Sequence, residues 1–122
     1  MTTFYPSLRY RDARAAIEWL ERAFGFTPKD VYENPDGTIA HAELAFGDGL
    51  VMLGSQKSDQ FGDHTGQGRC YVAATDVDAL HDRAVEAGAD VVRPPEDTDY
   101  GSRDFSCRDP EGNLWSFGTY NP

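Results

Sequence analysis

The stretch Asp-Pro-Glu-Gly-Asn-Leu-Trp-Ser-Phe at residues 109–117 decides the fold of this chain. Its first five residues predict a tight turn, because proline presets its own φ and glycine adopts a positive φ without strain. The residues from 114 to 120 are rich in aromatic side chains and predict a strand. An earlier turn, Gly-Asp-Gly at 47–49, is followed in the same way by an apolar strand over 50–54. One turn-and-strand pattern therefore occurs twice.

Each of these patterns ends a longer repeated unit. An aspartate that predicts an N-cap comes first, then an amphipathic segment, then a glycine that predicts the end of the helix. These features are Asp12, residues 13–24 and Gly25 in the first half, and Asp76, residues 77–87 and Gly88 in the second half. The equal order and similar spacing indicate an internal duplication.

Strand patterns surround both helices at matching places. The segments expected to form strands are 3–10, 26–33, 38–46 and 50–54 in the first unit, and 69–75, 89–93, 102–108 and 114–120 in the second. Pro6 has no N–H for a ladder, so the first strand is expected to lie at a sheet edge or to start late. Pro94 and Pro95 are expected to end the strand that begins at residue 89.

The duplicated order predicts an α+β fold made of tandem βαβββ repeats. The first unit is expected over residues 1–55, a linker loop over 56–68 and the second unit over 69–122, all within one domain. Each unit alone is too small to bury its sheet face. Two units side by side predict a curved eight-stranded mixed sheet around a cavity, with the helices outside.

Charge and composition exclude several classes of partner. The 122 residues carry 11 basic and 21 acidic side chains, a formal net charge of -10. Nucleic-acid binding and attachment to anionic lipid both need clustered Lys and Arg, so neither is expected. No apolar run approaches the length of a membrane span, and no secretory signal is visible. The two cysteines form no scaffold pattern, which favours reduced thiols in the cytoplasm.

The paired βαβββ units, with an aspartate before each helix and the late Asp-Pro-Glu-Gly-Asn turn, resemble the glyoxalase, bleomycin-resistance and extradiol-dioxygenase (vicinal oxygen chelate) superfamily. The resemblance covers essentially the whole chain. It implies metal ligands on the first and fourth strands of each unit, which here are Tyr5, Met52, Arg69 and Ser116. These side chains do not form a metal site, since divalent ions take imidazole, carboxylate or thiolate donors. We therefore expect no metal and no cofactor, as in the bleomycin-resistance branch.

Strand alternation places a group of side chains on the expected cavity face. Aromatic, hydroxyl and guanidinium groups together suit a small organic molecule, and a guanidinium can hold a carboxylate or phosphate. The expected ligand-binding residues are Tyr5, Ser7, Arg9, His41, Met52, Arg69, Tyr71, Asp104 and Ser116. The alternative is that these side chains only fill the cavity and bond each other.

Two functions remain open on the sequence. The first is a metal-independent protein that binds an antibiotic or a metabolite, and the resemblance implies that it is a homodimer. The alternative is a glyoxalase-like lyase or dioxygenase with an unusual site around His41, Glu43 and Asp104. Those three are equally explained as polar residues on a solvated strand face. Arginines in the cavity suit an anionic ligand, whereas the acidic surface attracts a cationic one, so the sequence leaves both open.

Overall fold

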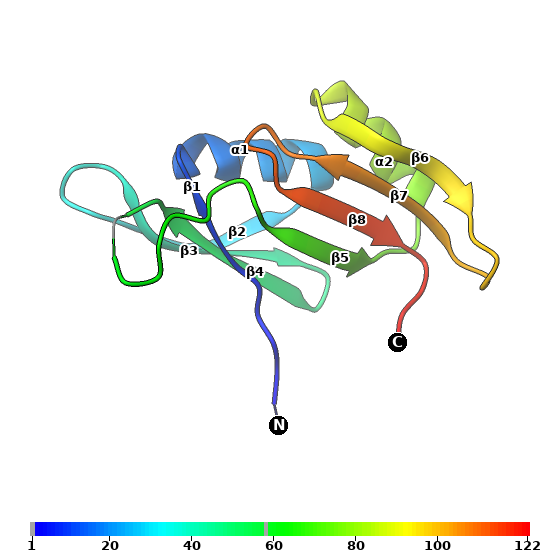
Figure 1. Ribbon diagram of the computed structural model, residues 1–122, viewed down its shortest axis with the longest axis horizontal. Coiled ribbons are helices and arrows are strands. Elements are labelled where there is room, and N and C mark those ends of the chain that lie inside the picture. The colour runs from blue at the N-terminus through cyan, green and yellow to red at the C-terminus, as the bar shows by residue number, and fades with distance from the viewer. Residues whose placement is uncertain (1, 58) are drawn as a thin grey trace.

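The computed structural model describes residues 2–57 and 59–122 and shows two helices and eight strands among them (Figure 1). The first module contains β1 (Ser7–Tyr10), α1 (Ala13–Phe24), β2 (Thr27–Glu33), β3 (Ile39–Phe46) and β4 (Gly49–Ser55). The second contains β5 (Arg69–Ala73), α2 (Val77–Glu86), β6 (Asp90–Asp97), β7 (Arg103–Arg108) and β8 (Leu114–Gly118). The expected α+β fold with a duplicated βαβββ order is confirmed. Ser58, inside the expected linker over 56–68, lies outside the described residues.

The first module forms sheet A, in the order β1-β4-β3-β2. Strand β1 runs parallel to β4, and the other neighbours are antiparallel. Both expectations for the proline-bearing strand hold, because β1 starts only after Pro6 and occupies a sheet edge. The register pairs Ser7 with Met52 and Met52 with Glu43, which places these three side chains in one row across the sheet.

The second module forms sheet B with the same order, β5-β8-β7-β6. The expectation that Pro94 and Pro95 end a strand is wrong, because β6 continues through them to Asp97. Strand β6 is an edge strand, and its register with β7 shifts between Arg93 and Glu96, so neither proline has to donate to the ladder. The eight strands thus form two four-stranded mixed sheets that do not close into a barrel.

Both helices begin where the aspartates predict. The Asp12 carboxylate accepts the backbone N–H of Ala15 at 3.1 Å, and the Asp76 carboxylate accepts that of Ala79 at 3.2 Å. Gly25 ends α1 with φ 78°, a left-handed conformation that glycine adopts without strain. The two helices lie on the same side of the strands (Figure 1). Neither is long and apolar enough to cross a membrane.

One hydrophobic core joins the two modules. Phe24 of α1 lies 5.6 Å from the Trp115 ring and 4.6 Å from the Phe117 ring, measured between centroids, so a first-module helix packs on second-module strand β8. The indole of Trp19 donates to the carbonyl of Ala87 at 2.8 Å, beyond the end of α2. The core therefore lies between the helices and both sheets, and the opposite face of each sheet is left open.

The turn at 109–113 also ties the modules together. The buried Asp109 carboxylate accepts the hydroxyl of Tyr10 at 2.7 Å and the indole N–H of Trp115 at 3.1 Å. The Glu111 carboxylate accepts the backbone N–H groups of Arg11 at 2.6 Å and Asp12 at 2.8 Å, at the start of α1. The most distinctive motif of the sequence is thus a structural clamp between the first and second modules.

Candidate functional site

The open face of each sheet is the face turned away from the helices. On sheet B the register aligns one row of side chains across all four strands, in the order Tyr71, Ser116, Ser106 and Arg93. Arg69 lies two residues before Tyr71 on β5 and therefore on the same face. These side chains belong to the second module alone, so a single sheet positions them.

A cavity of about 460 Å³ lies on the open face of sheet B. Four of the residues expected from the sequence to bind a ligand line it together. They are Arg69, Tyr71, Asp104 and Ser116. Tyr100 and Tyr120 complete an aromatic side, and their ring centroids lie 6.1 Å apart with the rings nearly perpendicular. The cavity thus combines aromatic surface with a few polar groups, as small-molecule sites usually do.

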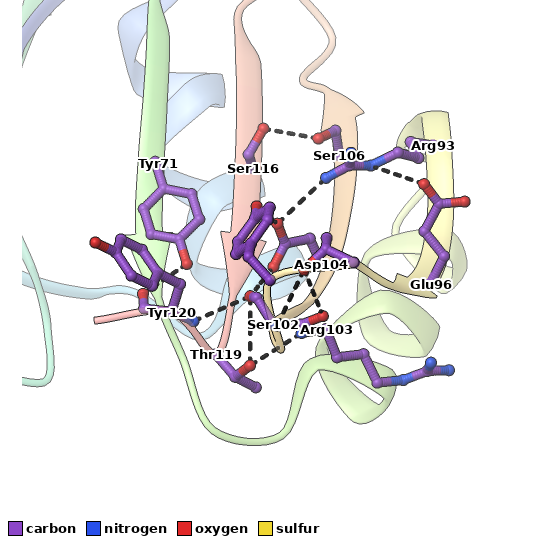
Figure 2. A network of polar contacts seen from close by, with 12 residues as sticks. Tyr71, Arg93, Glu96, Ser102, Arg103, Asp104, Ser106, Ser116, Thr119 and Tyr120 are labelled. Atoms are coloured by element: carbon purple, nitrogen blue, oxygen red, sulfur yellow. Dashed lines mark hydrogen bonds and ion pairs between the residues drawn. The ribbon is translucent and has the colours of Figure 1, made fainter. Parts of the chain in front are cut away.

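The Asp104 carboxylate is the most buried polar group of this cavity, with only 3% of the residue exposed. It accepts a hydrogen bond from the Ser102 hydroxyl and one from the Arg93 guanidinium at 3.4 Å (Figure 2). The Tyr100 hydroxyl donates a third, at 3.1 Å. Gly118 is required beside it, because a Cβ there would collide with the carboxylate. Asp104 therefore holds Arg93 and Tyr100 in place.

Tyr71 and Ser116 face the cavity beside this cluster. The Tyr71 hydroxyl donates to the carbonyl of Tyr120 at 2.6 Å, which fixes the ring against the C-terminal segment (Figure 2). Burial, and then the Asp104 carboxylate, raise the pKa of Tyr71. Ser106 and Ser116 share a hydrogen bond of 2.7 Å between their hydroxyls. One of the two hydroxyl hydrogens forms this bond, and the hydrogen of the other hydroxyl remains free to be donated.

The open face of sheet A carries a second set of expected residues. Ser7 and Arg9 line a cavity of about 530 Å³ together with the loop residues Phe61 and His64. Arg9 is not free there, because its guanidinium donates to the Asp59 carboxylate at 2.9 Å. That ion pair holds the loop after β4 against β1, and it lowers the pKa of Asp59.

Tyr5 and Met52 complete the expected set on the first module. Met52 pairs with Ser7 on the open face of sheet A, whereas Tyr5 precedes β1 and is half exposed. A separate groove of about 570 Å³ is lined by residues of both modules, among them Phe4, Phe46 and Tyr71, but its lining includes neither Tyr5 nor Met52. The nine expected residues are therefore divided between two sheets rather than gathered in one cavity.

His41 and Glu43 form a close pair on β3. The imidazole Nε2 lies 3.0 Å from the Glu43 carboxylate, and the ring stacks on Tyr32 of β2 with centroids 6.3 Å apart. Asp104, the third member of the suggested acid/base or metal site, lies on sheet B instead. No cluster of three or more His, Cys, Asp or Glu side chains suited to a metal occurs among residues 2–57 and 59–122.

The sequence reasoning missed three residues that line the sheet B cavity, Arg93, Tyr100 and Tyr120. It also missed Ser106, which bonds the lining residue Ser116. Ser106 was accessible to strand alternation, since it lies two residues after Asp104 on β7. Arg93 lies in the expected strand 89–93, but strand alternation puts it on the same face as Val91, and only the register shift between Val91 and Arg93 places it in the Ser106 row. Tyr100 lies in a loop that no strand pattern places. Tyr120 was expected at the end of the last strand, whereas β8 ends at Gly118.

Both cysteines are poor nucleophiles. Burial raises the pKa of the Cys70 thiol, and burial followed by the Asp109 charge raises that of Cys107 to about 12. A thiol reacts as the thiolate, so neither residue is activated at neutral pH. The sheet B cavity, which Cys70 borders, therefore offers contacts for binding rather than an activated sulfur nucleophile.

The family model described as the Glyoxalase/Bleomycin resistance protein/Dioxygenase superfamily matches residues 3–117. The chain belongs to this superfamily. An uncharacterized protein of Mycobacterium tuberculosis is 35% identical over 121 residues, which cover 93% of this chain and 71% of that protein. An uncharacterized protein of Mycobacterium bovis shows the same identity, with 80% of that protein covered.

Solved structures of the superfamily share the fold. TioX from Micromonospora sp. ML1 is 34% identical and superimposes with a TM-score of 0.83, over 99% of this chain and 100% of TioX. A glyoxalase I variant from Zea mays has a TM-score of 0.76 at 20% identity, over 97% of this chain and 44% of the maize protein. At that identity the maize enzyme shows a common fold alone.

Proposed function

We propose that this protein binds a small organic molecule, an antibiotic or a metabolite, without using a metal. The observation that carries the proposal is the chemistry of the sheet B cavity, where tyrosines, paired serines and arginines surround about 460 Å³ of space. The superfamily's metal enzymes take ligands at positions that are Tyr5, Met52, Arg69 and Ser116 in this chain. Two of those positions, Arg69 and Ser116, line this cavity, and neither side chain is a usual metal donor.

A homodimer is part of the proposal. Each chain presents two separate open faces, and each is open on the side away from the helices. A second copy placed over them would enclose a ligand that one sheet alone leaves exposed, and burying most of a ligand's surface is typical of small-molecule sites. Light scattering on the purified protein tests this, and a monomer at micromolar concentration would contradict it.

Two unactivated thiols agree with a cytoplasmic setting, which we propose for the protein.

Thermal shift combined with elemental analysis tests the binding function. The compounds are a basic glycopeptide antibiotic, a planar aromatic acid and its neutral amide. At least one is expected to raise the melting temperature, because a ligand that binds the native state stabilises it by mass action. Tyr71→Ala should reduce that shift, whereas Val31→Ala, at an exposed position on β2, should preserve it.

The metalloenzyme alternative predicts different results in the same preparation. A glyoxalase-like lyase or dioxygenase would carry stoichiometric Ni, Zn, Fe or Mn, and a chelator would abolish its turnover. That outcome would refute metal-independent binding. His41→Ala would then lower activity, since the pair of His41 with Glu43 is the closest acid/base arrangement on the open faces.

A further inference from the structure

We propose that the open face of sheet B contains a subsite for an anionic group of the ligand, a carboxylate or a phosphate, held by Arg69 and by the hydroxyls of Ser106 and Ser116. This inference rests on the proposed small-molecule binding and adds the charge of the ligand. It follows from an imbalance between free donors and free acceptors in the cavity.

Arg69 supplies the positive charge. Among residues 2–57 and 59–122 its guanidinium makes no hydrogen bond and no ion pair, and it lines the cavity. The other arginines near this face are occupied. Arg93 contacts Asp104 and lies 3.7 Å from Glu96, and Arg108 donates to the carbonyl of Gly112 at 3.0 Å. Arg69 is thus the guanidinium that remains available to a ligand.

Neutral donors lie across the sheet from Arg69. The Ser106 and Ser116 hydroxyls bond each other at 2.7 Å and retain one hydrogen that can be donated. The Nε of Arg93, the next residue of the same row, is buried, forms no hydrogen bond with a described residue and lies 3.7 Å from the Glu96 carboxylate. The donors left for a ligand are therefore the Arg69 guanidinium and the hydrogen that the serine pair retains.

Free acceptors are scarce in the same cavity. Asp104 contributes the one side-chain carboxylate among its described lining residues, and three donors already bond to its two oxygens. A cationic ligand would meet the free charge of Arg69, and no unoccupied side-chain carboxylate of the described lining offsets it. An anionic group fits, because guanidinium and hydroxyl donors are the usual partners of carboxylate and phosphate.

The tyrosines suggest the rest of the ligand. Tyr71, Tyr100 and Tyr120 line the cavity next to these donors. Aromatic rings of a ligand can pack against tyrosines in edge-to-face or offset geometry. An aromatic ring that bears an anionic group therefore matches both parts of the cavity, and simple aromatic acids are suitable probes.

An NMR titration of the full chain with benzoate, phenyl phosphate and benzamide tests the subsite. Benzoate and benzamide have nearly the same shape and differ in charge. We expect one of the two anions to shift the amide signals of Tyr71, Ser106 and Ser116 and to bind about tenfold more tightly than benzamide, since a hydrogen bond to a charged group is worth that factor or more. The tighter of the two anions identifies carboxylate or phosphate as the preferred group.

Arg69→Gln is expected to weaken the anion about tenfold and to leave benzamide binding unchanged. Because the Arg69 guanidinium makes no hydrogen bond and no ion pair with another described residue, the variant should fold normally. Arg108→Gln is the matched control on the same sheet and should bind as the wild type does. Benzamide binding as tight as the anions, an unchanged affinity in Arg69→Gln, shifts confined to sheet A, or no binding of any probe would each overturn the subsite.

These outcomes are distinguishable from failure of the proposed function. If the glycopeptide or benzamide stabilises the protein while the anions have no advantage, small-molecule binding stands and the anionic subsite is wrong. If the anions bind and the binding depends on Arg69, both proposals are supported. Stoichiometric metal in the elemental analysis, together with turnover that a chelator abolishes, would refute the proposed function, whatever the probes show at Arg69.

Discussion

The two modules have the same order of elements but bury their helices to different degrees. Helix α1 places seven described residues in the core, whereas α2 places two, Val77 and Ala84. The difference arises because α1 packs on its own sheet, on α2 and on β8 through Phe24. Helix α2 contacts α1 and two strands of its own module at the periphery. The repeated sequence pattern therefore gives two modules with similar backbones. Their packing makes helix α1 central and helix α2 peripheral.

The same leucine substitution on the two helices should give the largest difference in the free energy of unfolding between the modules. Leu20→Ala on α1 is expected to lower the free energy of unfolding by about 3–5 kcal/mol, because Leu20 is fully buried and its loss leaves a cavity. Leu80→Ala on α2 removes a partly buried side chain and should cost less than half as much. Urea unfolding measures both losses of stability, and equal losses would show that the two helices contribute equally to the core.

The turns that precede the last strand of each module should give the second-largest difference in stability. Asp109→Ala should cost about 3 kcal/mol, because the donors of Tyr10, Asn113 and Trp115 lose a buried carboxylate acceptor. Asp48→Ala in the corresponding first-module turn should change stability by less than about 0.5 kcal/mol, since that residue is exposed. A small effect of Asp109→Ala in thermal unfolding would mean that the turn does not clamp the modules.

Alkaline sensitivity is expected to come from the second module. Leu44 and Cys107 occupy equivalent places on β3 and β7, and only Cys107 titrates. Its pKa rises from 9.0 to about 12 on folding, so above pH 9.0 the unfolded chain releases a proton that the folded chain keeps. Stability should therefore fall as the pH rises through this window, with a slope of up to about 1.4 kcal/mol per pH unit.

Two variants separate this thiol from the nearby phenol. Cys107→Ala should flatten the loss of stability between pH 9 and 10 (about one unit above the ordinary thiol pKa). Tyr10→Phe should act at higher pH, because an unfolded tyrosine loses its proton near a pKa of 10.0, while burial and then the Asp109 charge raise the pKa of the folded phenol above that. Urea midpoints measured across this pH range are the test. An unchanged slope in Cys107→Ala would contradict the assignment.

The smallest expected effect concerns the contact between the helices. Arg83 of α2 donates to the carbonyl oxygens of Arg22 at 2.8 Å and Glu21 at 3.1 Å, at the C-terminal end of α1. Arg83→Gln should cost about 0.5–1 kcal/mol, because a cation there offsets the helix dipole and satisfies free carbonyls. Lys29→Gln, at an exposed position on β2, is the control and should be neutral. Equal melting temperatures for both variants would show that the contact of Arg83 with α1 does not stabilise the protein.

Much of the fold was predictable because its signals are local. Asp12 and Asp76 cap helices wherever the chain places them, and Gly25 accepts a positive φ that other residues resist. Strand alternation correctly placed Tyr71 and Ser116 on the same side of sheet B. The strand limits at Pro94 and Pro95 were wrong, because an edge strand with a shifted register tolerates proline and the sequence does not show which strand is at the edge.

The candidate site was predictable only in part. Arg69, Tyr71, Asp104 and Ser116 line one cavity, and this grouping was expected. The separation of Asp104 from His41 was not, because equivalent positions of a repeat look adjacent when the halves are aligned. In the fold each belongs to its own sheet, so the likeness of two positions in the pattern carries no information about the distance between them.

The sequence by itself determined the order of elements, the caps, the turns and the side of each strand that is polar, because these depend on residues a few positions apart. The tertiary structure decided that α1 is the central helix and that the Asp109 turn clamps the modules. It also decided that Arg9 and Arg93 are paired, whereas the Arg69 guanidinium meets no partner among the residues that the structure describes. Those features depend on which groups meet across long chain separations. Such contacts arise from packing two modules on one core, and no local pattern specifies them.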